Sequence, residues 1–257
     1  VELDAFNPFI PQDADASGLP VAILRWRLRN PLPTPVDATV AFSLLNAVGH
    51  DGQGSLHGRK NAAFGGNLNE RVEEPGLAGL RLTSRASDGP GAGSLAVAST
   101  WPRQTFTLRW ERAGWFDTLQ SFWDGLCSTG RLADDPVAVP SPDGETDVGT
   151  LGLMASIGPG ATVELPFILA WHFPNLTNYW NREPGVAGQR LGNYYATRFA
   201  DAWDAARYTA TRLPHLETET RRYHDTLFES TLPPVVLDAA SSQSAIIRTT
   251  TCVRTED

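Results

Sequence analysis

The sequence predicts a mainly β fold, an antiparallel β-sandwich followed by α-helices. Two observations support this prediction. Apolar residues recur at every second position up to Trp171, which is the period of β-strands, and they recur at helical spacing from Phe199 onward. An aromatic- and Asn-rich segment joins the two regions. We therefore expect residues 1–173 to form the sandwich, residues 174–196 a junction loop, and residues 197–257 a helical region.

The alternation is clearest in residues 21–29, where Leu24, Trp26 and Leu28 lie opposite a row of arginines. Such a pattern is typical of a sheet with one buried face and one face in water. Turn sequences such as Asn30-Pro31 and the glycine- and proline-rich residues 88–91 and 158–160 separate the runs. Most connections are too short to hold a helix, so the strands are expected to pair antiparallel.

Two segments depart from the strand pattern. Residues 115–126 place aromatic and leucine side chains at helical spacing, which predicts a helix beside a sheet; these are Trp115, Leu119, Phe122, Trp123 and Leu126. Residues 46–76 are rich in glycine and asparagine and are predicted to form one long loop. Loops of this length are usually functional or mobile.

The helical region has an apolar stripe that is interrupted at Pro214, so it forms either two helices or one helix kinked at this proline. A further helix is predicted to start at Pro233-Pro234. The stripe needs a partner to cover it. We therefore expect exposed apolar surface, and self-association of the chain, along Phe199, Trp203, Tyr223, Leu227 and Phe228.

Composition excludes several classes of function. The net charge is −8, with 29 acidic residues against 21 lysines and arginines, and so argues against a nucleic-acid partner. No apolar run approaches the roughly 20 residues that span a bilayer. Two cysteines, Cys127 and Cys252, are too few for a disulfide framework and favour a reducing, cytoplasmic location. The chain begins at Val1 without a signal peptide or a starting Met, so we expect a segment of a longer protein.

The sequence carries few signs of its own catalytic chemistry. The five histidines show no zinc-ligand spacing, and no nucleophile motif is present, so we expect neither a metal nor a cofactor. Glu73-Glu74 and Asp134-Asp135 are paired carboxylates, but neighbours in an extended chain point to opposite sides. We interpret both pairs as solvated loops, and Glu217 as solvated helix surface.

The junction loop is the strongest candidate for binding. It combines flat aromatic faces with amide and imidazole groups, the mixture that binds sugars. The candidate substrate-rim residues are His172, Asn175, Tyr179, Trp180, Asn193 and Tyr194. The alternative is that the aromatic side chains pack the sandwich against the helices while the amides satisfy turns.

Several motifs occur in order along nearly the whole chain. They are FNPFIP (6–11), GLPVAILRW (18–26), FSLLN (42–46), EEPGLAGL (73–80), LAWHFPN (169–175), GNYYATRFADAWD (192–204) and STLPPVVLDAASSQ (230–243). Through these motifs the chain resembles the N-terminal portion of the non-lysosomal glucosylceramidase, or bile-acid β-glucosidase, family, which is glycoside hydrolase family 116.

The resemblance implies that the helices are the first of a truncated (α/α)6 barrel. It further implies a parent enzyme that hydrolyses β-glucosides or glucosylceramide with retention, using a Glu nucleophile and an Asp acid/base in that barrel. No residue of this chain matches either carboxylate, so no catalytic residue is assigned and the chain alone is expected to be inactive. The implied partner is the C-terminal (α/α)6 catalytic domain of the same protein. The resemblance also allows peripheral membrane association of the parent protein.

These observations favour a non-catalytic scaffold that braces the barrel and lines the mouth of its active site. A free-standing carbohydrate-binding β-sandwich module is the first alternative, but the amphipathic helices argue against it because their apolar face needs a partner. An enzyme that acts through Glu73-Glu74 or Asp134-Asp135 is the second alternative.

Overall fold

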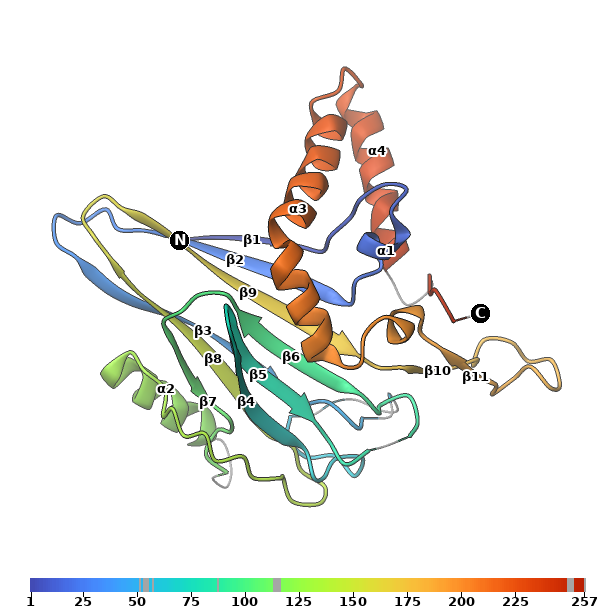
Figure 1. The fold of residues 1–257 in the computed structure, drawn as a ribbon, viewed down its shortest axis with the longest axis horizontal. Helices are drawn as coiled ribbons and strands as arrows, with labels where there is room; N and C mark the ends of the chain where they lie inside the picture. Colours follow the sequence, from blue (N-terminus) through green and yellow to red (C-terminus); the bar gives the residue numbers. More distant parts are fainter. Residues whose placement is uncertain are drawn as a thin grey trace.

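The protein is described here by a computed structural model, which covers residues 1–50, 52, 56, 58–86, 88–112, 117–248 and 252–256. A six-stranded sheet, shown in Figure 1, has the order β1-β2-β9-β6-β5-β4. Its strands are β1 (Glu2–Phe6), β2 (Val21–Arg29), β9 (Thr162–His172), β6 (Ser94–Ser99), β5 (Leu77–Thr83) and β4 (Leu68–Glu74). A three-stranded sheet has the order β3-β8-β7, formed by β3 (Val36–Leu45), β8 (Val148–Ile157) and β7 (Gln104–Thr107). Each of these neighbouring pairs is antiparallel, which confirms the prediction of a mainly antiparallel β fold.

The first core lies between the two sheets. The apolar side chains that the sequence pattern places on one face of each strand meet here, and Phe42 of β3 lies 5.8 Å from Phe167 of β9 between ring centroids. Its fully buried members include Leu80, Leu82, Leu151, Leu153 and Leu165.

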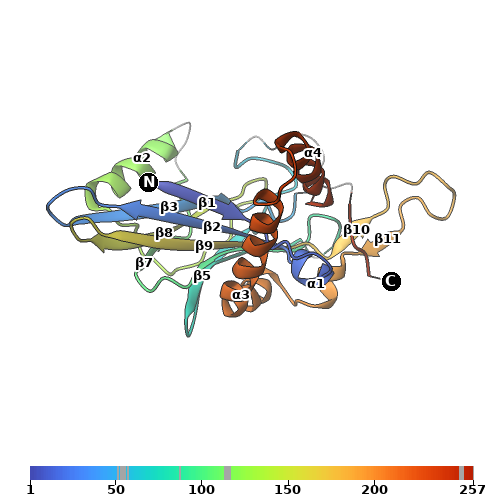
Figure 2. The same cartoon turned by 90° about the horizontal axis from the view of Figure 1, so that it is seen from above.

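A second core covers the other face of the six-stranded sheet. Helix α3 (Ala202–Phe228) packs across β9 and β6, with the short helix α1 (Ala14–Ser17) nearby (Figure 2). Alanines on both sides, including Ala96 and Ala98 of β6 and Ala205 and Ala206 of α3, leave room for the helix to approach the strands closely. The expectation of one face in water is therefore wrong beneath α3, because this helix covers that face.

Helix α3 is a single helix of 27 residues with Pro214 inside it, so the alternative of two separate helices is wrong. It begins after Asp201, whose side chain accepts a hydrogen bond from the Asp204 amide at 2.8 Å. The predicted exposure of Phe199 and Trp203 is wrong: they are 5% and 4% exposed because the start of α3 is packed on the sheet.

The outer half of α3 leaves the sheet. The buried residues of α3 end at Leu216, and the helix then runs outward to a turn followed by α4 (Pro234–Ser244) and the 3₁₀ turn η2 (Ala245–Arg248). In Figure 1 the outer half of α3 and helix α4 stand away from the sheets as a helical hairpin. The predicted start of a helix at the Pro233-Pro234 pair is confirmed.

The remaining elements confirm one prediction and correct another. Helix α2 (Asp117–Thr129) matches the predicted helix; Phe122 stacks on Trp110 at 4.3 Å between centroids, while Trp115 lies outside the described residues. The predicted loop over 46–76 is too long, because β4 begins at Leu68. Asn46, which is fully buried, donates hydrogen bonds to Asn69 and to the Thr83 carbonyl, so its amide ties the start of this segment to the six-stranded sheet.

Candidate substrate-rim site at the junction

The junction begins where β9 ends at His172. The chain then forms a hairpin of β10 (Asn175–Thr177) and β11 (Arg190–Gly192), followed by the 3₁₀ turn η1 (Tyr194–Thr197) and the start of α3. In Figure 1 the hairpin projects from the end of the six-stranded sheet that carries α1. The candidate residues therefore lie on a compact connection between the sheet and α3.

His172 anchors this connection. The side chain is 7% exposed, its Nε2 lies 2.9 Å from the Phe199 carbonyl oxygen, and its ring and that of Tyr195 form a T-shaped pair with centroids 5.7 Å apart. Burial lowers the pKa of His172 below its usual range. The ring is therefore neutral near pH 7, with an Nε2–H that can donate to the carbonyl and hold the end of β9 against the start of α3.

Asn175 and Asn193 use their amides within the chain. Asn175 is 7% exposed, donates to the Gly89 carbonyl at 3.0 Å and accepts from Arg190. Asn193 donates to the Phe173 carbonyl at 2.8 Å, an oxygen that also accepts from the Tyr195 hydroxyl. These amides shape the loop.

Tyr179 and Trp180 lie in the segment that joins β10 to β11 and are 74% and 51% exposed. Their rings meet edge to face, with centroids 5.2 Å apart and planes at 85°. The turn that presents them is held by Asn178, whose buried side chain accepts from the Asn181 amide at 3.1 Å. The pair offers flat aromatic surface on a fixed turn.

Tyr194 lines a groove of about 400 Å³ that segments far apart in the sequence build together. Trp171, Leu19 and Val253 supply apolar walls. The Arg254 guanidinium carbon lies 3.3 Å from the ring centroid of Tyr194. Sequence reasoning missed Arg254 and Leu19, because no local pattern marks residues that only the tertiary fold brings to Tyr194.

A comparison with known families identifies the domain. The family described as β-glucosidase 2, glycosyl-hydrolase family 116 N-terminal, matches residues 1–216. The chain belongs to this family. The resemblance noted from the sequence motifs is thereby confirmed. The match ends at the last buried residue of α3, so the family 116 N-terminal domain comprises both sheets, the junction and the inner half of α3. Membership also implies a catalytic domain as its partner in the parent protein.

The adjacent carboxylates Glu73 and Glu74 of this family 116 domain make hydrogen bonds and ion pairs within the fold. Glu73 and Glu74 lie in β4 and not in a loop, which corrects the sequence interpretation. Glu74 accepts hydrogen bonds from the Trp203 indole at 3.0 Å and from Arg207 at 3.3 Å. Glu73 pairs with Arg71 at 3.0 Å. These contacts give Glu74 a role in joining the edge strand to α3.

Asp134 is likewise bound and not solvated. It accepts hydrogen bonds from the Thr105 hydroxyl at 2.9 Å and the Phe106 amide at 2.8 Å, and it pairs with Arg131. Burial opposes ionisation of Asp134, but these hydrogen bonds outweigh it and hold the pKa of the carboxyl below its usual range. Its contacts tie residues 131–134 to β7.

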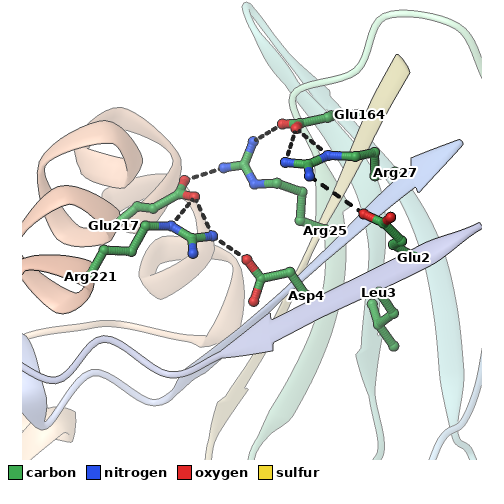
Figure 3. A pocket seen from close by; sticks show the side chains of 8 residues that line it. All are labelled: Glu2, Leu3, Asp4, Arg25, Arg27, Glu164, Glu217 and Arg221. Carbon is green, nitrogen blue, oxygen red and sulfur yellow. Dashed lines mark hydrogen bonds and ion pairs between the residues drawn. The ribbon is translucent and has the colours of Figure 1, made fainter. Parts of the chain in front are cut away.

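A charged cluster lines a cavity of about 320 Å³ between β1, β2, β9 and α3 (Figure 3). Arg25 of β2 binds Glu164 of β9 at 3.2 Å and also Glu217 of α3. The side chain of Glu217 is 19% exposed, so its interpretation as solvated helix surface is wrong. Arg25 faces α3 because β2 lies beneath this helix, which the strand pattern alone could not reveal.

Among the described residues, no group of three or more His, Cys, Asp or Glu side chains is arranged to hold a metal ion. Nor does any helix in that part of the chain combine the length and apolarity needed to cross a bilayer. Cys127 and Cys252 are free and exposed.

Proposed function

We propose that this chain is the non-catalytic N-terminal scaffold of a retaining β-glucosidase or glucosylceramidase-like enzyme. It would brace an (α/α)6 catalytic barrel of the same protein and line the mouth of the active site. Family membership supports the identification as the N-terminal part of such an enzyme. The bracing role is supported by α3, which is buried in its inner half and not in its outer half. This helix is rooted in the core of the sheet at one end and presents uncovered apolar side chains at the other.

The bracing surface in this proposal is the α3–α4 hairpin. Phe228 and Leu232 are each 46% exposed, and Val235 and Val236 are 74% and 43% exposed. A helical hairpin with such side chains in water gains stability when another apolar surface covers them. A helical barrel offers a surface of this kind, since helices pack through apolar side chains.

The rim in this proposal is the β10–β11 hairpin with the groove at Tyr194. Tyr179 and Trp180 would cover the C–H faces of a glucoside, because their rings are exposed. His172, Asn175 and Asn193 would position the loop through their hydrogen bonds within the chain. The substrate class is a β-glucoside, with glucosylceramide as the lipid-linked case, and the location is cytoplasmic.

Activity on an aryl β-glucoside tests the scaffold role. The chain alone is expected to be inactive, and the parent protein that contains it active. Within the parent, Trp180→Ala is expected to raise KM. Trp123→Ala is the matched control, because Trp123 is similarly exposed (56% against 51% for Trp180) but lies on α2. Hydrolysis by the chain alone would refute the scaffold role, and equal KM values for the two variants would refute the rim.

A free-standing carbohydrate-binding module is the second candidate, and the exposed Tyr179–Trp180 pair is the observation that favours it. It predicts that the chain alone binds cello-oligosaccharides and that Trp180→Ala abolishes this binding. Isothermal titration calorimetry on the 257-residue chain decides the point. Absence of binding in the chain alone, together with a KM effect in the parent, would favour the scaffold.

A further inference from the structure

The charged cluster of Figure 3 lies directly after a weak point of α3. Pro214 has no amide hydrogen, so the helix lacks the hydrogen bond that would join this position to the Ala210 carbonyl. The ring of a proline inside a helix also crowds the preceding turn, which makes such positions common sites of bending. Apolar packing on the sheet ends two residues later at Leu216. The outer half of α3 therefore begins where both the helix ladder and the core weaken.

Beyond Leu216, ionic contacts connect α3 to the strands. Glu217 accepts from Arg25 of β2 and from Arg221 at 3.0 Å, and Arg221 also binds Asp4 of β1. The side chains of Arg25 and Glu217 are each only 19% exposed, so water screens this pair less than it screens a surface pair. We call Arg25, Glu217, Arg221 and Asp4 the ionic latch.

The segment that follows β1 reinforces the latch. The Phe9 amide donates to the Thr220 hydroxyl at 3.1 Å, and the Phe9 ring lies 5.0 Å from that of Tyr223 between centroids. These contacts come from the N-terminal segment, whereas Arg25 joins the helix to the interior of the sheet. Arg25 thus joins β2, and through Glu164 also β9, to the outer half of α3.

We infer that the ionic latch is a conformational device that fixes the direction of the outer half of α3 by locking a hinge at Pro214. When the latch is closed, the α3–α4 hairpin is held in one orientation relative to the sheets. When it opens, the helix beyond Pro214 moves relative to the sheets and carries α4 with it. This inference rests on the contacts above and stands whether or not the hairpin binds a catalytic domain.

Spin-label distance measurements on the 257-residue chain test the device. Labels are placed by Asp37→Cys on β3 and Thr226→Cys on the outer half of α3, both exposed, with C127S and C252S to remove the native thiols. Arg25→Met removes the Arg25 guanidinium from the latch and keeps an apolar side chain at this position. Arg27→Met is the matched control, because the hydrogen bonds of Arg27 in the described residues join Glu2 and Glu164, in β1 and β9, and not α3.

The expected result is a broader or displaced distance distribution for Arg25→Met and an unchanged one for Arg27→Met. Amide exchange in residues 217–228 should be roughly tenfold faster in Arg25→Met, since a largely desolvated pair is lost. Raising salt from about 0.1 M to 1 M shortens the Debye length from about 10 Å to 3 Å. It should loosen the wild-type helix less than Arg25→Met does, because salt screens the exposed Arg221–Asp4 pair more than the largely buried Arg25–Glu217 pair.

Equal behaviour of the two arginine variants would overturn the inference, as would an outer helix whose exchange is insensitive to both substitution and salt. If Arg25→Met does not fold, Glu217→Gln opens the same latch from the helix side and leaves β2 intact. A Glu217→Gln protein with the wild-type distance distribution and exchange rates would equally refute the latch.

Discussion

Trp203→Ala tests whether α3 belongs to the core of this family 116 domain. Trp203 is 4% exposed, packs with Ala205 and Ala206 over the sheet, and donates to Glu74 at 3.0 Å. A buried tryptophan removes about 150–250 Å² from water, which at about 25 cal/mol per Å² corresponds to about 4–6 kcal/mol. Core substitutions of this kind cost about 3–5 kcal/mol. We therefore expect Trp203→Ala to lower the free energy of unfolding by about 4 kcal/mol.

Urea unfolding followed by circular dichroism measures this change. The midpoint temperature of thermal unfolding should fall by about 8–16 °C for a domain of this size. Trp203→Phe should lose only about 1 kcal/mol, because it retains most of the packing and gives up one hydrogen bond. Trp123→Ala is the control: Trp123 is 56% exposed on α2, so the change should stay within about 0.5 kcal/mol. Equal midpoints for Trp203→Ala and Trp123→Ala would refute the packing of α3 on the sheet.

Three further predictions follow from single contacts. Gly79→Ala should destabilise the fold strongly, because a Cβ there would lie 2.1 Å from the Val97 carbonyl oxygen, whereas Gly158→Ala meets open space and should be neutral or stabilising by chemical denaturation. His172 has a lowered pKa in the folded state, so as the pH falls the unfolded state binds the His172 proton first. The stabilisation of the folded state by neutral His172 is therefore complete above about pH 6.5 and is lost as the pH falls below that value. His172→Gln should flatten this part of the curve of unfolding free energy against pH, and an unchanged slope would contradict the assignment. Val235, at 74% exposed, should promote self-association of the chain, so Val235→Glu should lower the mass measured by light scattering at high concentration, and a wild-type chain that is already monomeric there would contradict this.

Local patterns predicted the strands well because they depend on the two-residue period of an extended chain. Leu24 and Trp26 of β2 pack in the core between the sheets, as their alternation indicates. The same pattern failed on the opposite face, where Val21 and Ile23 are fully buried beneath α3. The alternation in a strand shows which residues share a face, but it does not show which element covers that face.

The candidate site shows the same division. Its aromatic and amide composition marked the junction from the sequence, and the structure places Tyr179 and Trp180 in an exposed turn. The amides of Asn175 and Asn193 are instead occupied by Gly89 and Phe173. Composition cannot distinguish an amide that is free for a ligand from one that closes a turn, because that depends on where distant carbonyl groups lie.

The sequence by itself determined the antiparallel strands, helices α2 and α4, the junction and the family, since each depends on local periodicity or on an ordered set of motifs. Only the tertiary structure decided that α3 is both a core helix and a projecting one, and that Glu217 meets Arg25 across 192 positions of sequence. Charge pairing acts over a few ångströms of space. The two charged groups come that close to each other only when α3 packs across the sheet.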